Sequence, residues 1–186
     1  MKTHQHPVNE KQRLSALEEL QLFPVIQEDN FDNITQLASF ICKTPVSLIT
    51  LIGKDKQYFK SKVGTELTEA DRDISHCTHA ILNPEELLEI PDTREDSRFS
   101  NNPYTVGNPP ILFYAGMPLK ASNGSAIGTL CVLDTQPRQL QNDEKIALKA
   151  LARQVENLFE LRRQNLDLNK TKNELKQRNH QLKDFA

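Results

Sequence analysis

The sequence predicts an α+β domain, with helices covering an antiparallel sheet, followed by a long coiled-coil helix. Three observations lead to this prediction. The hydrophobic period is helical at both ends of the chain and alternating in the middle. Two pairs of apolar strands are each joined by a polar turn. Leucine recurs at every seventh position of the last quarter, at Leu161, Leu168, Leu175 and Leu182.

The first two predicted elements are helices. Leucines at near-helical spacing predict a helix over about 9–22, which Pro24 ends because proline cannot continue the hydrogen-bond ladder. A second helix is predicted over about 29–43, because its apolar residues from Phe31 to Ile41 fall on one stripe.

Two hairpins follow, separated by an irregular region. Residues 46–52 and 57–62 are apolar or alternating and predict the first hairpin. Residues 111–118 and 126–133 predict the second, because Asn123-Gly124 between them is a strong hairpin signal. The region between the hairpins, about 64–110, predicts a short helix near 75–82, a short strand near 87–90 and a long loop. A loop of this length inside a compact domain is usually functional.

A single helix is predicted from 139 to 186. Its first half carries a stripe that packs on the domain, and its second half carries the heptads. With leucine at heptad position d, asparagine falls at two a positions, which favours a parallel, in-register homodimer. The pattern is interrupted at Ala186, so we expect an output domain beyond it. The residues that line the predicted dimer helix are Leu158, Leu161, Asn165, Leu168, Lys172, Leu175, Asn179 and Leu182.

Composition restricts the classes of partner and the compartment. A formal net charge of −2 over 186 residues gives no strong attraction to nucleic acid or to an anionic membrane. The first thirty residues lack the apolar segment of a signal peptide, and no apolar stretch approaches the length of a membrane span, so we expect a cytoplasmic protein. Three widely spaced cysteines favour buried thiols over a disulfide framework.

Five phrases cover most of the predicted domain: RLSALEELQLF, VSLITLIGKDKQYFKS, ISHCTHAI, IPDTREDSRFSNNPYTVGNPPILFYAGMPL and GSAIGTLCVLDTQPRQL. They resemble the GAF domain of bacterial signalling proteins that precedes histidine kinases and cyclases. The resemblance implies a six-stranded antiparallel sheet with helices packed on one face. It also implies a small-molecule pocket on the other face, beneath the loop and helix lobe of residues 64–110.

A second resemblance concerns the closing residues LKDFA, which are similar to the segment before the phosphorylated helix of soluble sensor histidine kinases. It implies that the chain is the input module of a two-component kinase. We therefore divide the chain into an N-terminal tail (1–12), a GAF sensory domain (13–160) and a signalling helix (161–186).

The expected pocket residues carry polar or sulfur atoms and come from the lobe and from the second hairpin. The resemblance and the position of the lobe predict that they converge on one concavity. His76, Cys77 and His79 cannot all face one ion from a regular helix, so we expect no metal site. The candidate ligand-binding residues are Cys77, His79, Asp92, Asp96, Tyr114, Thr129 and Cys131.

Two of these groups have alternative interpretations. Asp92 and Asp96 have the spacing of loop carboxylates that cap backbone N–H groups and pair with Arg94 or Arg98. Cys77 and Cys131 are interpreted either as small apolar core residues or, if one pKa is depressed, as redox-active thiols.

Three function classes remain open at this point. The first is a regulatory module whose ligand or neighbouring domain changes the geometry of the dimer helix. The second is a dimerisation spacer without a ligand. The third is an enzyme such as the methionine-sulfoxide reductases that share this fold, which depend on loop cysteines that this chain does not reproduce. We expect the first, with no catalytic residue in this chain and with cofactor and ligand unidentified.

Overall fold

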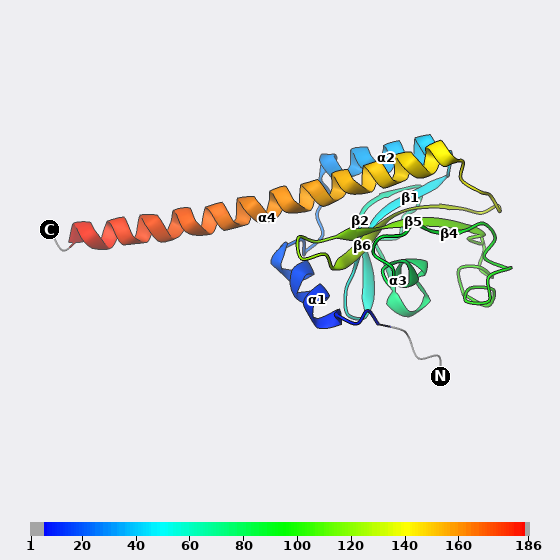
Figure 1. Ribbon diagram of the computed structural model, residues 1–186, viewed down its shortest axis with the longest axis horizontal. Helices are drawn as coiled ribbons and strands as arrows, with labels where there is room; N and C mark the ends of the chain where they lie inside the picture. Colours follow the sequence, from blue (N-terminus) through cyan, green and yellow to red (C-terminus); the bar gives the residue numbers. More distant parts are fainter. Residues whose placement is uncertain (1–5, 185–186) are drawn as a thin grey trace.

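The structure is a computed structural model that describes residues 6–184. Residues 1–5 of the predicted tail, and Phe185 and Ala186 of the predicted signalling helix, lie outside the described residues. Figure 1 shows a sheet domain from which one long helix extends. Its helices are α1 (Glu10–Glu19), α2 (Asp29–Cys42), the 3-10 turn η1 (Arg72–Ile74), α3 (His76–Ala80) and α4 (Asn142–Asp184).

The strands form a single six-stranded sheet in the order β3-β2-β1-β6-β5-β4, and every neighbouring pair is antiparallel. The predicted α+β class and six-stranded sheet are confirmed. The strands are β1 (Val46–Ile52), β2 (Lys56–Val63), β3 (Glu69–Asp71), β4 (Leu88–Ile90), β5 (Phe113–Lys120) and β6 (Ala126–Asp134). Strand β3, with sequence Glu69-Ala70-Asp71, gave no sequence signal, because three residues are too few to show a hydrophobic alternation.

Both predicted hairpins are present, and their first and last strands pair in the middle of the sheet. Thr50 of β1 lies opposite Thr129 of β6, and the two hydroxyls hydrogen-bond at 2.9 Å. Gly128 allows this approach, since a Cβ there would lie 1.8 Å from the Thr50 carbonyl oxygen.

Each face of the sheet buries its own apolar cluster. Helices α2 and α4 lie side by side on one face, where Ile49, Leu51 and Val132 point toward them. Residues 64–110 cover the other face, where Leu48, Ile52 and Cys131 point. This alternation follows from the two-residue period of a strand and places a lobe of loops and short helices opposite the helical layer.

A buried charge cluster ties α1 to the sheet and to the lobe. The guanidinium of Arg13 donates to the Ile52 carbonyl at 2.6 Å, and that of Arg72 donates to the Gly53 carbonyl at 2.9 Å. The carboxylate of Glu10 bridges both arginines, with N···O distances of 2.8 Å to Arg13 and 2.6 Å to Arg72. The predicted tail, residues 1–12, therefore includes the first turn of α1 and this carboxylate.

The long helix changes its surroundings along its length. Its first half packs through Leu148, Val155 and Phe159, as the stripe predicted. Arg162 makes a further contact, donating to the carbonyls of Leu20 at 2.6 Å and Gln21 at 2.7 Å. The heptad leucines 161, 168, 175 and 182, which begin next to Arg162, are 53–69% exposed. No helix among residues 6–184 is long and apolar enough to cross a membrane.

We predict that Glu10→Gln destabilises the domain by about 2 kcal/mol at pH 7, because two buried guanidinium groups lose their counter-charge. Burial by itself raises the pKa of Glu10, but its hydrogen bonds to Arg13 and Arg72 outweigh burial and lower the pKa to about 2. The stabilisation is therefore present above about pH 4.5 and is lost as the pH falls toward about 2. Urea unfolding as a function of pH measures it.

The exposed Glu18 of the same helix provides the control. Glu18→Gln changes the net charge equally and should leave the unfolding free energy within about 0.5 kcal/mol of the wild-type value. Equal effects of the two substitutions would contradict the role of the cluster.

Candidate functional site

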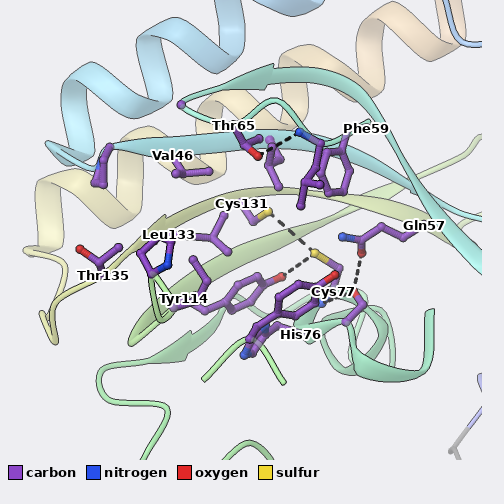
Figure 2. A pocket seen from close by; sticks show the side chains of 18 residues that line it. Val46, Gln57, Phe59, Thr65, His76, Cys77, Tyr114, Cys131, Leu133 and Thr135 are labelled. Carbon is purple, nitrogen blue, oxygen red and sulfur yellow. Dashed lines mark hydrogen bonds between the residues drawn. The ribbon is translucent and has the colours of Figure 1, made fainter. Parts of the chain in front are cut away.

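A cavity of about 410 Å³ lies between the sheet and the lobe. Figure 2 shows β1, β2, β5 and β6 on one side of it and α3 on the other. None of the described residues that line it is Lys, Arg, Asp or Glu. The lining residues are Pro45, Val46, Leu48, Gln57, Phe59, Gly64, Thr65, Leu67, Ser75, His76, Cys77, Tyr104, Pro109, Ile111, Tyr114, Cys131, Leu133 and Thr135.

The phrase FYAGMPL on β5 determines how Tyr114 lies. Tyr114 and Gly116 are two residues apart and therefore share the face that the lobe covers. A Cβ at Gly116 would lie 2.1 Å from the Tyr114 hydroxyl, so glycine is what allows this ring to lie flat along the strand. The Tyr114 hydroxyl then donates a hydrogen bond to Sγ of Cys77, at 3.3 Å.

Two thiols meet in the wall of the cavity. Cys77 comes from α3 and Cys131 from β6, and their Sγ atoms are 3.8 Å apart. Burial by itself raises the pKa of Cys77, but hydrogen bonds with Cys131, Thr129 and Tyr114 outweigh burial, and the pKa lies below its ordinary value. Burial and the neighbouring Cys77 raise the pKa of Cys131 well above the ordinary range. The contacts of Cys77 therefore favour its thiolate, whereas the surroundings of Cys131 favour its thiol.

His76 contributes a neutral imidazole to the cavity. Its ring stacks on Tyr114 and packs against Phe99, with centroids 5.2 Å and 4.6 Å away. Burial lowers the pKa of His76 to about 4, with smaller contributions from the charges of His79 and Arg98 that outweigh that of Asp96. Its buried Nε2 has no hydrogen-bond partner among residues 6–184. A buried nitrogen without a partner is costly, and a bound molecule could satisfy it.

Ser75 and Gln57 provide further polar atoms near the thiols. The Ser75 hydroxyl caps α3 by accepting from the Cys77 amide at 3.1 Å, which is the usual role of serine at a helix start. The same hydroxyl donates to the side-chain oxygen of Gln57. Figure 2 shows the amide nitrogen of Gln57 turned toward the cavity.

Of the seven predicted pocket residues, three line this cavity: Cys77, Tyr114 and Cys131. Thr129 is not among the lining residues, and it is buried and hydrogen-bonded to Thr50. His79 is half-buried and meets the Phe99 ring edge-on, at 4.8 Å between centroids.

Asp92 and Asp96 cap their own turns in the loop. Asp92 accepts from the Arg94 amide at 3.0 Å, and Asp96 accepts from the Arg98 amide at 2.9 Å. Each carboxylate also pairs with the guanidinium of the same arginine, which lowers its pKa. This is the loop-capping geometry that their spacing also suggested.

Sequence reasoning did not select Gln57, Ser75 or His76 as pocket residues. His76 was considered only as a metal ligand, although its place beside Cys77 at the start of a short helix was a usable signal. Among the described residues, no group of three or more His, Cys, Asp or Glu side chains could hold a metal ion.

The structure is thus an α+β domain with a six-stranded antiparallel sheet, helices on one face and a cavity on the other. Residues 28–159, more than half of the chain, match the model of the GAF domain family, and the chain belongs to this family. Over 148 residues it is also 33% identical to a cyclic di-GMP phosphodiesterase of Pseudomonas aeruginosa. That match covers 80% of this chain but only 25% of the relative's length.

Solved structures share the fold at low sequence identity. A free methionine-R-sulfoxide reductase from Neisseria meningitidis is 17% identical, with a TM-score of 0.60 over 89% of this chain and 99% of that one. The GAF domain of an Acinetobacter phosphoenolpyruvate-protein phosphotransferase is 15% identical, with a TM-score of 0.57 over 80% and 92%. A domain described as part of a two-component sensor histidine kinase from Sinorhizobium meliloti is 17% identical, with a TM-score of 0.55 over 77% and 97%. These likenesses show the fold alone.

We predict that the His76 ring makes the stability of the domain depend on pH in a range that extends above the pKa values of most carboxyl groups. Because burial lowers its pKa from 6.5 to about 4, the unfolded state takes up the proton first as the pH falls. The free energy of unfolding should fall between pH 6.5 and about 4, with a slope of up to about 1.4 kcal/mol per pH unit.

His76→Phe keeps the ring packing and removes the titration, so it should flatten this slope in denaturant unfolding. The control is His6→Phe, which replaces an exposed histidine and should leave the slope unchanged. A wild-type slope that persists in His76→Phe would assign the pH dependence to other groups.

Proposed function

We propose that this chain is the regulatory domain of a signal-transduction protein. In this proposal the domain binds a small uncharged molecule in the cavity beneath its lobe and relays the bound state through a parallel dimer of α4. The observation that carries it is the cavity of about 410 Å³, within the range of about 300–1,000 Å³ that is usual for small-molecule sites. Membership of the GAF family supports the regulatory role.

The lining argues for the class of ligand. A charged group buried without a partner is strongly disfavoured, and the cavity offers no charged side chain and a histidine that is neutral at pH 7. The ligand should therefore have an apolar body that packs on Val46, Phe59 and Leu133. One polar end should reach the Nε2 of His76 or the amide of Gln57.

The two other function classes are less well supported. A ligand-free spacer would need a cavity filled by side chains, and this one is open. The three cysteines lie on α2, α3 and β6 and not on the loops, which does not favour a reductase that depends on loop cysteines.

For the output domain, the closing residues LKDFA favour a histidine kinase. The Pseudomonas relative, named a cyclic di-GMP phosphodiesterase, supports a second candidate.

The surface of α4 supports the dimer. Its exposed leucines repeat with the heptad over a helix segment that leaves the domain (Figure 1). Most of a helix's stability in a protein comes from packing of its apolar face, and pairing would bury the leucine stripe and stabilise this segment. A parallel pair would place Asn165 against Asn165 and Asn179 against Asn179 of the second copy.

We predict that naphthol, an uncharged probe, stabilises the domain, whereas naphthoate, its carboxylate counterpart, does not. At a hundredfold excess over its Kd, naphthol should add about 2.7 kcal/mol, measured as a rise in Tm. Val46→Trp fills the cavity from β1 and should abolish the shift. Val8→Trp, the same change at an exposed position, should preserve it.

Native mass spectrometry of the purified chain should also detect a co-purified neutral compound that Val46→Trp loses. The spacer interpretation would replace the proposal if neither naphthol nor any co-purified compound binds. A preference for naphthoate would contradict the ligand class.

We predict that the double variant Leu161→Gln/Leu168→Gln weakens the dimer and leaves the sheet domain folded, because the packing stripe of the domain ends near Phe159. Light scattering should report the loss of half the mass, with the thermal melting of the sheet unchanged. Lys170→Gln, on the outer side of the heptad, should remain dimeric. A wild-type monomer, or a pair with its C-termini at opposite ends, would contradict the relay.

A further inference from the structure

The Cys77–Cys131 pair has a geometry that a pair of ordinary core thiols does not need. Cys77 is 3% exposed and Cys131 is fully buried, and both line the cavity. Their sulfur atoms come from opposite sides of it, one from the lobe and one from the central strand β6. The third cysteine, Cys42, is buried in the helical layer on the other face of the sheet.

We propose that Cys77 and Cys131 form a reversible disulfide when a peroxide enters the cavity, so that this wall is an oxidant-sensing modification site. The inference rests on the open cavity of the proposed function but not on its ligand. A peroxide is an uncharged molecule little larger than water, which a cavity without charged residues admits.

The chemistry balances with one peroxide for each disulfide. Cys77 gives its proton to solvent, and its thiolate attacks one peroxide oxygen, forming an S–O bond and breaking the O–O bond. The leaving hydroxide takes up a proton and becomes water, so Cys77 becomes a sulfenic acid. Sγ of Cys131 then attacks Sγ of Cys77, the S–S bond forms, and the hydroxyl leaves as water with the Cys131 proton. Two thiols lose two electrons, and the peroxide is reduced.

The surroundings of the sulfurs assign the two roles. The Tyr114 hydroxyl donates a hydrogen bond to Sγ of Cys77, which stabilises a thiolate there. Among the described residues, Tyr114 makes no such hydrogen bond to Cys131. The two Sγ atoms lie 3.8 Å apart. A disulfide bond is about 2.05 Å long, so the two sulfur atoms must move closer before the bond can form. Cys131 is held in the sheet opposite Leu48 and Gly116, and α3 is a five-residue helix in the lobe.

Closure should therefore draw α3 toward the sheet. Ser75 and His76 at the start of α3 line the cavity, so the cross-link would change the wall that faces the ligand. An oxidant would in this way alter ligand binding without occupying the ligand site permanently.

The test exposes the full chain to hydrogen peroxide, unfolds it, blocks remaining thiols by alkylation and measures the intact mass. We expect wild type to retain one alkylatable thiol, to lose two hydrogen atoms and to yield a peptide that links Cys77 to Cys131. Dithiothreitol should restore all three thiols. Cys42→Ser, the matched control with a buried thiol removed elsewhere, should cross-link at the wild-type rate.

The single variants separate the two roles. Cys131→Ser should accumulate a sulfenic acid on Cys77 that dimedone traps, whereas Cys77→Ser should leave Cys131 reduced. Tyr114→Phe should shift the pH midpoint of Cys77 oxidation upward, which a purely structural role of the ring would not do. Bound naphthol should slow cross-linking severalfold if the oxidant enters through the same cavity.

Three results would overturn the inference. They are retention of all three thiols under conditions that oxidise free cysteine in the same tube, a cross-link that includes Cys42, and a link between two chains in place of one within a chain. Failure of naphthol to bind would count against the proposed function alone, because cross-linking requires no ligand.

Discussion

The pairing of β1 with β6 is the constraint on which the other contacts of this domain depend. Both strands are buried on both faces, and successive side chains along each strand belong alternately to two separate apolar clusters. The pairing joins hairpins that are about eighty residues apart, at Thr50 and Thr129, and Gly128 gives the backbones room to approach. With this pair in place, one face can receive α2 and α4 and the other can receive the lobe.

Helix α1 connects the two sides of the sheet. At its start, Glu10 bridges Arg13 and Arg72, and the Arg72 carbonyl accepts from the Thr78 hydroxyl of α3. Just beyond its end, the carbonyls of Leu20 and Gln21 accept from Arg162 of α4. A continuous set of contacts therefore runs from α3 through α1 to Arg162, near the point where α4 leaves the domain. This arrangement is what the proposed relay would use, whether a ligand or a disulfide displaces α3.

The cavity combines features that are rarely useful in a packed core. Its lining carries no charge among the described residues, it holds a neutral histidine with a buried nitrogen left unpaired, and it brings two thiols within 3.8 Å. A core selected only for stability would fill such a space and pair such a nitrogen, since both cost free energy. The same features are expected of a site that exchanges its contents with solvent.

Apart from the short strand β3, the sequence by itself determined the order and type of the helices and strands, because helical and strand periods are properties of neighbouring residues. Both hairpins, the packing stripe of α4 and the exposed heptad leucines were predictable in this way. The resemblance of its phrases to GAF domains also gave the sheet and the position of a pocket. Only the tertiary structure decided which polar side chains reach that pocket. Asp92 and Asp96 hydrogen-bond to Arg94 and Arg98 of the same loop and do not line the cavity. Gln57, Cys131 and His76 line the cavity together because distant strands pair and the lobe docks on the sheet. A side chain's neighbours across a sheet depend on register and on the fold of loops, and no local period in the chain encodes them.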